Sequence, residues 1–193
     1  MPDADRIDLS NQFLIAMPGM VDENFAGSVV YLCEHNERGA LGLVINKPTD
    51  LRLGQLFDRV ELTLDRPELA EQPVFFGGPV QTERGFVLHD PAGAEVEPYA
   101  STLNVTDGLS LTTSKDVLEA LAHGAGPRRL LVTLGYSGWQ AGQLEDEIRA
   151  NGWLNVQADP SVIFDTPVAE RYGRALSLLG FDPRMLSQEA GHA

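Results

Sequence analysis

Short apolar runs separated by glycine and proline fill the first half of the chain, a pattern typical of β-strands. Residues 28–35 are apolar on both faces, which predicts a central strand. Residues 36–39 predict a turn, and residues 40–46 the returning strand of a hairpin. Further strands are expected at residues 13–17, 73–76, 85–89, 109–113, 129–134 and 162–164.

Helical spacing of apolar residues predicts four helices. One contains Leu53, Leu56, Phe57 and Val60, and the next follows Ser114 as N-cap. A third covers residues 142–150. The last opens at Pro167 and closes at Gly180, and the side chains expected on its buried face are Ala169, Tyr172, Leu176 and Leu179. Residues 61–72 are interpreted as a polar connection. Strands that come early and helices that are scattered indicate an α+β domain rather than a regular βαβ alternation.

The composition supports one folded domain with an acidic surface. Hydrophobic residues make up 43% of 193 residues, enough for a sizeable core. The 14 Lys and Arg against 28 Asp and Glu give a formal charge of −14, which repels phosphate backbones, so direct nucleic-acid binding is not expected. Arg128 and Arg129 are the only adjacent basic pair, and they abut a strand that is expected to be buried.

The ends of the chain and its single cysteine bear on location. Residues 1–10 are interpreted as a loose acidic leader, unlike a basic secretory n-region, residues 11–186 as the domain, and residues 187–193 as a frayed tail. The apolar run at residues 13–17 is far shorter than the roughly 20 residues that cross a bilayer. Cys33 has no partner for an intrachain disulfide. We expect a cytoplasmic protein without a membrane anchor.

Residues 135–145, which follow an apolar strand, are the most distinctive stretch of the chain. Glycines at 135, 138 and 142 imply tight backbone geometry or close packing. Ser137 does not complete the nucleophile elbow of a hydrolase, because Trp139 stands where that motif needs glycine. A phosphate cradle is disfavoured by Glu145 in the first helical turn. The simplest interpretation is a capped helix packed on a sheet by tryptophan.

Cys33 and His35 are a second candidate site. Strand geometry places both on one face with α-carbons about 7 Å apart, which would allow a reactive thiolate–imidazolium pair. The alternative is a buried cysteine that acts as a small hydrophobe. His35, His89 and His123 are too scattered to predict a metal site. Glu145 and Arg149 fit a surface i,i+4 ion pair.

Six motifs together carry a family resemblance, at residues 11–18, 30–36, 42–48, 77–80, 85–89 and 135–145. From about residue 10 to residue 181 the chain closely resembles the AlgH family, also called YqgE, of small bacterial proteins. The resemblance implies a single α+β domain in which a split β-sheet curls into a pseudo-barrel with helices packed outside. The family is labelled a transcriptional regulator and has no agreed activity or catalytic residues, so no catalytic residue is transferred.

The sequence therefore favours a regulatory or binding protein that acts through a small ligand or a protein partner. The alternative is an enzyme that uses Cys33 and His35 or the stretch at residues 135–145. No cofactor is expected. If a ligand site exists, strand ends that meet near that stretch are expected to border it, and the candidate residues are Asn46, Lys47, Gly77, Gly78, Ser137, Trp139, Gln143 and Glu145.

Overall fold

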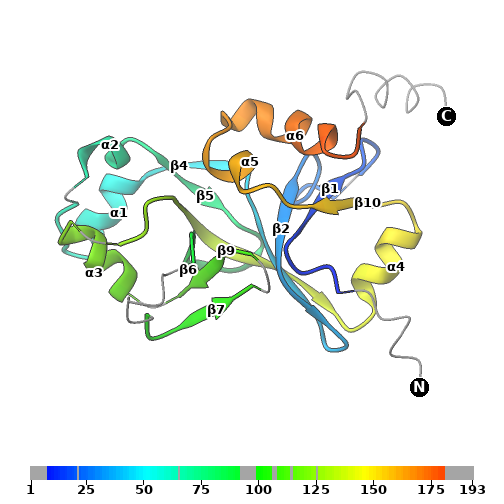
Figure 1. The fold of residues 1–193 in the computed structure, drawn as a ribbon, viewed down its shortest axis with the longest axis horizontal. Coiled ribbons are helices and arrows are strands. Elements are labelled where there is room, and N and C mark those ends of the chain that lie inside the picture. The colour runs from blue at the N-terminus through cyan, green and yellow to red at the C-terminus, as the bar shows by residue number, and fades with distance from the viewer. Residues whose placement is uncertain are drawn as a thin grey trace.

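The computed structural model describes residues 8–20, 22–64, 66–91, 99–105, 108–113, 115–124 and 126–180, and Figure 1 shows their arrangement. The strands are β1 (Gln12–Ala16), β2 (Val29–Asn36), β3 (Gly39–Val44), β4 (Pro48–Arg52), β5 (Pro73–Phe76), β6 (Val80–His89), β7 (Thr102–Asn104), β8 (Ser110–Thr112), β9 (Leu130–Gln140) and β10 (Trp153–Gln157). The helices are α1 (Leu53–Arg59), α2 (Pro67–Ala70), α3 (Asp116–Ala122), α4 (Gln143–Arg149), α5 (Pro160–Phe164) and α6 (Val168–Ser177).

The described strands form one sheet that divides at β9. Its main path runs β10-β1-β2-β3-β9-β6-β8-β7, and β5 and β4 branch from it. The C-terminal part of β9 pairs antiparallel with β3, and its N-terminal part pairs antiparallel with β6. Thr133 and Leu134 of β9 pair in parallel with Phe75 and Phe76 of β5. Because the same residues also pair with β6, β5 lies on the opposite edge of β9. The predicted α+β class and split sheet are confirmed.

Two glycines permit the close approach at which the sheet divides. Gly135 has φ +77°, and a Cβ there would lie 2.4 Å from the carbonyl oxygen of Gly78. Gly78 has φ +155°, and its Cβ would lie 2.2 Å from the carbonyl of Tyr136. Both φ values fall in the region that L side chains rarely adopt. The close packing expected from the glycine spacing is confirmed at Gly135, whereas a Cβ at Gly142 would meet no atom within 4 Å.

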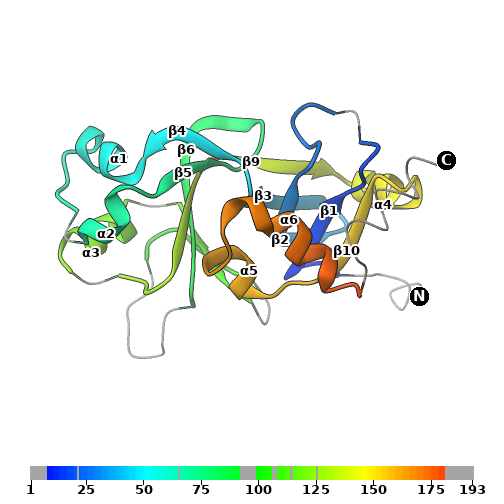
Figure 2. The ribbon, with the colours of Figure 1, turned by 90° about the horizontal axis from the view of Figure 1, so that it is seen from above.

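Apolar residues fill three clusters on the faces of this sheet. The largest lies between the curled sheet and the pair α5 and α6, and it includes Phe13, Tyr31 and Leu176. A second packs Trp139, Leu144 and Trp153 beneath α4, and a third packs Phe57 and other residues of α1 and α3. Figure 2 shows α5 and α6 lying along the part of the sheet that contains β1 and β2, while α1, α2 and α3 gather at the opposite end from α4.

Most predicted strands are confirmed, but β4, β7 and β10 lie where no strand is predicted, and three further segments differ from expectation. Residues 162–164 belong to α5, because Asp159 caps the backbone N–H of Ser161 at 3.0 Å and Pro160 occupies the first helical turn. The strand predicted at residues 129–134 continues to Gln140, so most of the glycine-rich stretch is strand. The connection at residues 61–72 contains α2.

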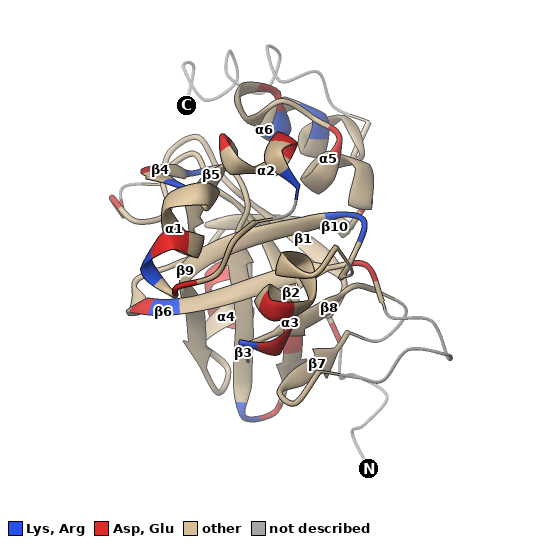
Figure 3. Ribbon diagram, turned by 90° about the vertical axis from the view of Figure 1, so that its left-hand side faces the viewer, with Lys and Arg blue, Asp and Glu red and all other residues tan. Residues whose placement is uncertain are grey.

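The N-terminal boundary also differs. Leu9 is only 5% exposed and packs in the cluster beneath α4, so the packed chain already includes part of the expected leader. Residues 1–7, the N-cap expected at Ser114 and the tail at residues 187–193 lie outside the described residues. No helix in the described ranges is long and apolar enough to cross a membrane. Figure 3 shows that charged residues lie mainly on helices and strand ends.

Candidate functional site

The strand ends named in the sequence analysis meet, but mainly through backbone packing. Ser137 is fully buried, and its hydroxyl donates to the carbonyl of Gly77 at 3.0 Å. The backbone N–H of Phe76 donates to the carbonyl of Lys47 at 2.8 Å. The Asn46 side chain bonds Val29 and Gly27, and the Lys47 ammonium bonds the carbonyl of Asn24. These side chains are engaged in holding loops rather than presented together.

Trp139 and Trp153 share one carboxylate on α4. Both indole N–H groups donate to Oε1 of Glu147, at 3.1 and 2.9 Å, and Gln143 donates to its other oxygen at 2.8 Å. Trp139 is 6% exposed. This arrangement satisfies buried donors and fixes α4 on the sheet, as the structural interpretation of the stretch expects.

A cavity of about 530 Å³ lies beside Trp139, between the β2–β3 hairpin and the end of β9. Gln143 borders it, but its side-chain oxygen accepts from the Gln140 backbone and its amide bonds Glu147. Glu34 and Arg38 place opposite charges on the other side. The cavity has no surplus of one charge to select a ligand.

Cys33 and His35 do not form the expected pair. A register shift between Leu32 and Glu34 breaks the two-residue alternation of β2. Cys33 stays in the large cluster, whereas His35 accepts from the Leu9 backbone N–H through Nδ1 at 3.0 Å. Its Nε2 must then carry the proton, and it donates to Glu145 at 3.2 Å. Glu145 therefore pairs with His35, and the expected pair with Arg149 is replaced by Arg149 to Asp146.

We expect Cys33 to react slowly in the native protein. The side chain is 2% exposed, and burial raises the pKa of its thiol, which lowers the thiolate fraction at neutral pH. Maleimide labelling at pH 7.5 should be at least about tenfold slower than in denaturant. Equal rates in both conditions would contradict the buried position.

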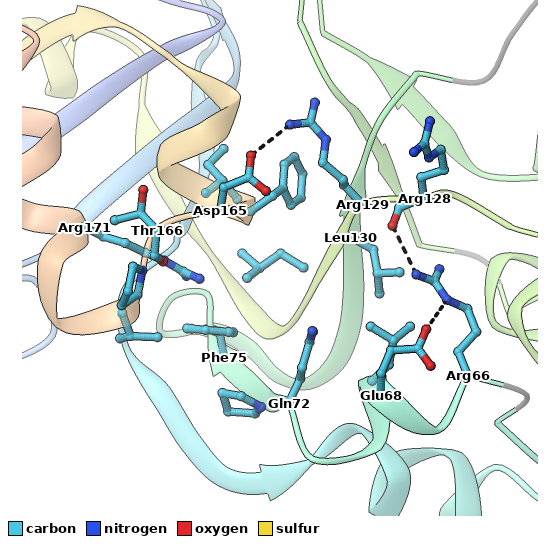
Figure 4. A pocket seen from close by; sticks show the side chains of 17 residues that line it. Arg66, Glu68, Gln72, Phe75, Arg128, Arg129, Leu130, Asp165, Thr166 and Arg171 are labelled. Atoms are coloured by element: carbon cyan, nitrogen blue, oxygen red, sulfur yellow. Dashed lines mark hydrogen bonds and ion pairs between the residues drawn. The ribbon is translucent and has the colours of Figure 1, made fainter.

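A second cavity, of about 460 Å³, gathers basic side chains that the sequence analysis did not select. It lies between α2, β5 and the start of β9 on one side and α5 and the first half of α6 on the other, as Figure 4 shows. Its arginines are Arg66, Arg128, Arg129 and Arg171. Apolar residues line the rest of the wall, among them Leu69, Phe75, Leu130, Leu131, Ile163, Phe164 and Val168. We call this space the arginine cavity.

Arg171 is the only Lys, Arg, Asp or Glu that is buried among the described residues, with 7% of its surface exposed. Nε donates to the Thr166 carbonyl at 3.0 Å and Nη1 to the Ile45 carbonyl, while the guanidinium carbon lies 5.0 Å from the ring centroid of Phe75. Nη2 has no hydrogen-bond partner among the described residues, yet it is not sealed from solvent. Figure 4 shows the guanidinium pointing into the cavity.

No carboxylate in the described residues neutralises Arg171. Burial lowers the pKa of Arg171 to about 10, because desolvation disfavours the charged form. The group nevertheless stays cationic at neutral pH. A buried charge without a counter-ion is costly, and it suits a site that receives an anion from outside.

The other arginines of the cavity already have partners or face outward. Arg66 donates to Glu68 and to the carbonyls of Pro127 and Arg128. Arg129 donates to the Asp90 carboxylate at 2.9 Å, and its guanidinium lies 3.5 Å from the carboxylate of Asp165. The Arg128 side chain is exposed and, in Figure 4, points away from the cavity.

The sequence held a signal for this site that helical spacing could have revealed. Arg171 lies four residues before Ala175 and three after Val168, so it falls on the face of α6 that packs against the sheet. Ala169, which was expected on that face, is exposed. A charge on a buried helical face, together with the pair Arg128 and Arg129, points to the cavity.

The described residues contain no group of three or more His, Cys, Asp or Glu side chains that could hold a metal ion.

Comparison with known proteins places the whole chain among close relatives. The AlgH-like family model matches residues 13–184. A UPF0301 protein of Ralstonia nicotianae is 66% identical over 192 residues, which cover 100% of this chain and 98% of that protein. A UPF0301 protein of Burkholderia cenocepacia is 63% identical over 190 residues, with 98% of each chain covered.

Two solved structures resemble the fold. The solution structure of the AlgH protein from Pseudomonas aeruginosa has a TM-score of 0.76 and 49% identity, and 96% of each chain is covered. The crystal structure of a protein from Corynebacterium diphtheriae has a TM-score of 0.68 at 21% identity, with 88% of this chain and 86% of that chain covered. The second similarity concerns the fold alone.

Proposed function

This chain belongs to the AlgH-like family, and we propose that it is a cytoplasmic regulatory protein that binds a small organic anion in the arginine cavity. The observation that carries the proposal is Arg171, a buried guanidinium without a carboxylate partner at a cavity of about 460 Å³. That volume lies in the range of small-molecule sites, roughly 300–1,000 Å³.

The contacts of Arg171 separate a structural role from a binding role. Its bonds to Thr166 and Ile45 tie the start of α6 to the sheet and use Nε and Nη1. They leave Nη2 and the full positive charge unmatched. A ligand anion would accept a hydrogen bond from Nη2 and neutralise the charge of Arg171. Such a charge-assisted hydrogen bond is worth roughly 1.5–3 kcal/mol.

Duplex DNA is a poor fit to the same features. DNA affinity comes largely from cations that neutralise many phosphates, whereas this chain carries a formal charge of −14. The arginine cavity is concave, and Glu68, Asp90 and Asp165 hold two of its arginines. We therefore propose regulation through a small ligand and not through direct DNA contact.

The thiol and the hydroxyl considered for the enzyme alternative are both buried. Cys33 is 2% exposed, and the Ser137 hydroxyl is buried on the carbonyl of Gly77.

Calorimetric titration with a panel of anions tests the proposal. The probes are benzoate, inorganic phosphate and adenosine monophosphate, with benzamide and adenosine as uncharged controls. We expect at least one anion to bind at 1:1 stoichiometry, and neither control to bind. Arg171→Gln should weaken that binding by roughly 10- to 100-fold, since it removes a charge-assisted bond.

Two further variants distinguish a direct loss of binding from a loss of folding. Arg171→Lys keeps the charge and should retain part of the affinity. Arg174→Gln makes the same charge change at an exposed position of α6 and should bind as the wild type does. Failure of every anion at millimolar concentration, or equal affinity in folded Arg171→Gln, would refute the proposal.

A further inference from the structure

The side chains that line the arginine cavity indicate which class of anion it binds. The inference below rests on the proposed function. We infer that the ligand is a monocarboxylate with an apolar body, that its carboxylate binds Arg171, and that the neighbouring charge of Asp165 weakens its binding. The inference follows from the free donors, the charge balance and the walls of the cavity.

The number of free donors limits the head group. Nε and Nη1 of Arg171 each give one N–H to the carbonyls of Thr166 and Ile45, so one N–H on Nη1 and both on Nη2 remain open. Nη2 offers two N–H groups, which suit one or two carboxylate oxygens. A phosphate has three terminal oxygens that accept strong hydrogen bonds, and Arg66 is already engaged through all three of its nitrogens.

The charge balance points to a single negative charge. Four arginines line the cavity, against the carboxylates of Glu68 and Asp165 on its wall and Asp90 on Arg129. Arg128 points away from the cavity, Arg66 pairs with Glu68, and Arg129 pairs with Asp90 and Asp165, so the one unpaired positive charge that faces the cavity is that of Arg171. A monoanion neutralises that charge, whereas a phosphate ester near −2 at neutral pH leaves an excess of negative charge beside Asp165.

The wall indicates the rest of the molecule. Leu130 and Leu131 at the start of β9 and Ile163 and Phe164 of α5 line the cavity. The uncharged polar side chains on this wall are Gln72 and Thr166, and Thr166 directs its hydroxyl to the carbonyl of Ser161. An apolar ligand body would remove these surfaces from water at a gain of about 25 cal/mol per Å².

Asp165 is placed to repel a carboxylate that binds Arg171. Its side chain is 60% exposed, and Oδ2 lies 3.5 Å from Nη1 of Arg129, a loose contact beside the tight pair that Arg129 forms with Asp90. Figure 4 shows Asp165 and Thr166 side by side between Arg129 and Arg171. A ligand carboxylate on Arg171 would therefore enter next to Asp165, and the two negative charges would repel each other.

The experiment compares ligands that share a body and differ in the head group. Wild-type protein is titrated at pH 7.5 with benzoate, phenylacetate and hexanoate, with phenyl phosphate as the dianion and benzamide as the neutral match. We expect one or more carboxylates to bind at least tenfold more tightly than phenyl phosphate. Asp165→Asn should strengthen carboxylate binding by roughly 2- to 5-fold, as expected for loss of one exposed charge interaction. Asp146→Asn, an exposed acid on α4, should change nothing.

The outcomes separate this inference from the function it rests on. Tighter binding of phenyl phosphate than of every carboxylate overturns the monocarboxylate and leaves an anion site. If the carboxylates bind Asp165→Asn as tightly as the wild type, or less tightly, the proposed repulsion by Asp165 is overturned. No binding by any charged probe overturns the anion site as well.

Discussion

Replacing Gly78 with alanine is expected to destabilise the protein by roughly 4 kcal/mol or more, the range of exceptional single substitutions. A Cβ at this position would lie 2.2 Å from the carbonyl carbon and oxygen of Tyr136 and 2.4 Å from the nitrogen of Ser137. These neighbours are backbone atoms of β9, which cannot turn aside as a side chain can. The φ of +155° adds strain for any L side chain. Urea unfolding followed by circular dichroism measures the loss.

Gly85→Ala is the matched control within the same region of the sheet. Gly85 lies in β6, is exposed, and has no atom within 4 Å of a built Cβ. Its substitution should change the unfolding free energy by no more than about 0.5 kcal/mol. Similar stability of the two alanine variants would contradict the close contact of Gly78 with β9.

Trp139→Ala is expected to cost roughly 3–5 kcal/mol, the usual loss for a buried tryptophan. The ring is 6% exposed and contacts Trp153 and Phe25, whose ring centroids are each 6.0 Å away. The substitution also removes one of the two indole N–H groups that Glu147 accepts. Thermal and urea unfolding provide the measurement, and Leu178→Ala, at an exposed apolar residue, is the control.

A loss below about 1 kcal/mol would show that Trp139 contributes little to the core. In that case the cavity beside Trp139 would again be a candidate ligand site. The predicted large loss instead leaves the stretch at residues 135–145 with a structural role.

Local pattern was sufficient to predict much of the fold. Apolar residues on both faces of β2 predicted a central strand, and β2 indeed lies between β1 and β3. The failures came from features that periodicity does not contain. The bulge at Cys33 is a property of strand pairing, and it separated Cys33 from His35. The apolar triplet at residues 162–164 is ambiguous by itself, and the cap at Asp159 decided for helix.

The candidate site was harder to predict because it depends on distant segments. The arginine cavity unites α2, β5, the start of β9 and α6, and its arginines lie between residues 66 and 171. Nothing in the sequence near Arg171 shows that its guanidinium reaches the carbonyl of Ile45. The stretch around Trp139 attracted attention because glycine and tryptophan are conspicuous, yet its polar groups bond one another.

The most direct test of the arginine cavity is a crystal soaked with 4-bromobenzoate and measured at the bromine absorption edge. Bromine gives an anomalous signal that locates the ligand without assumption about its site. We predict a bromine peak in the arginine cavity, bordered by Leu130 and Ile163, with the carboxylate within hydrogen-bond distance of Nη2 of Arg171. A fully occupied bromine peak elsewhere, such as beside Trp139, with an empty arginine cavity would contradict the central claim.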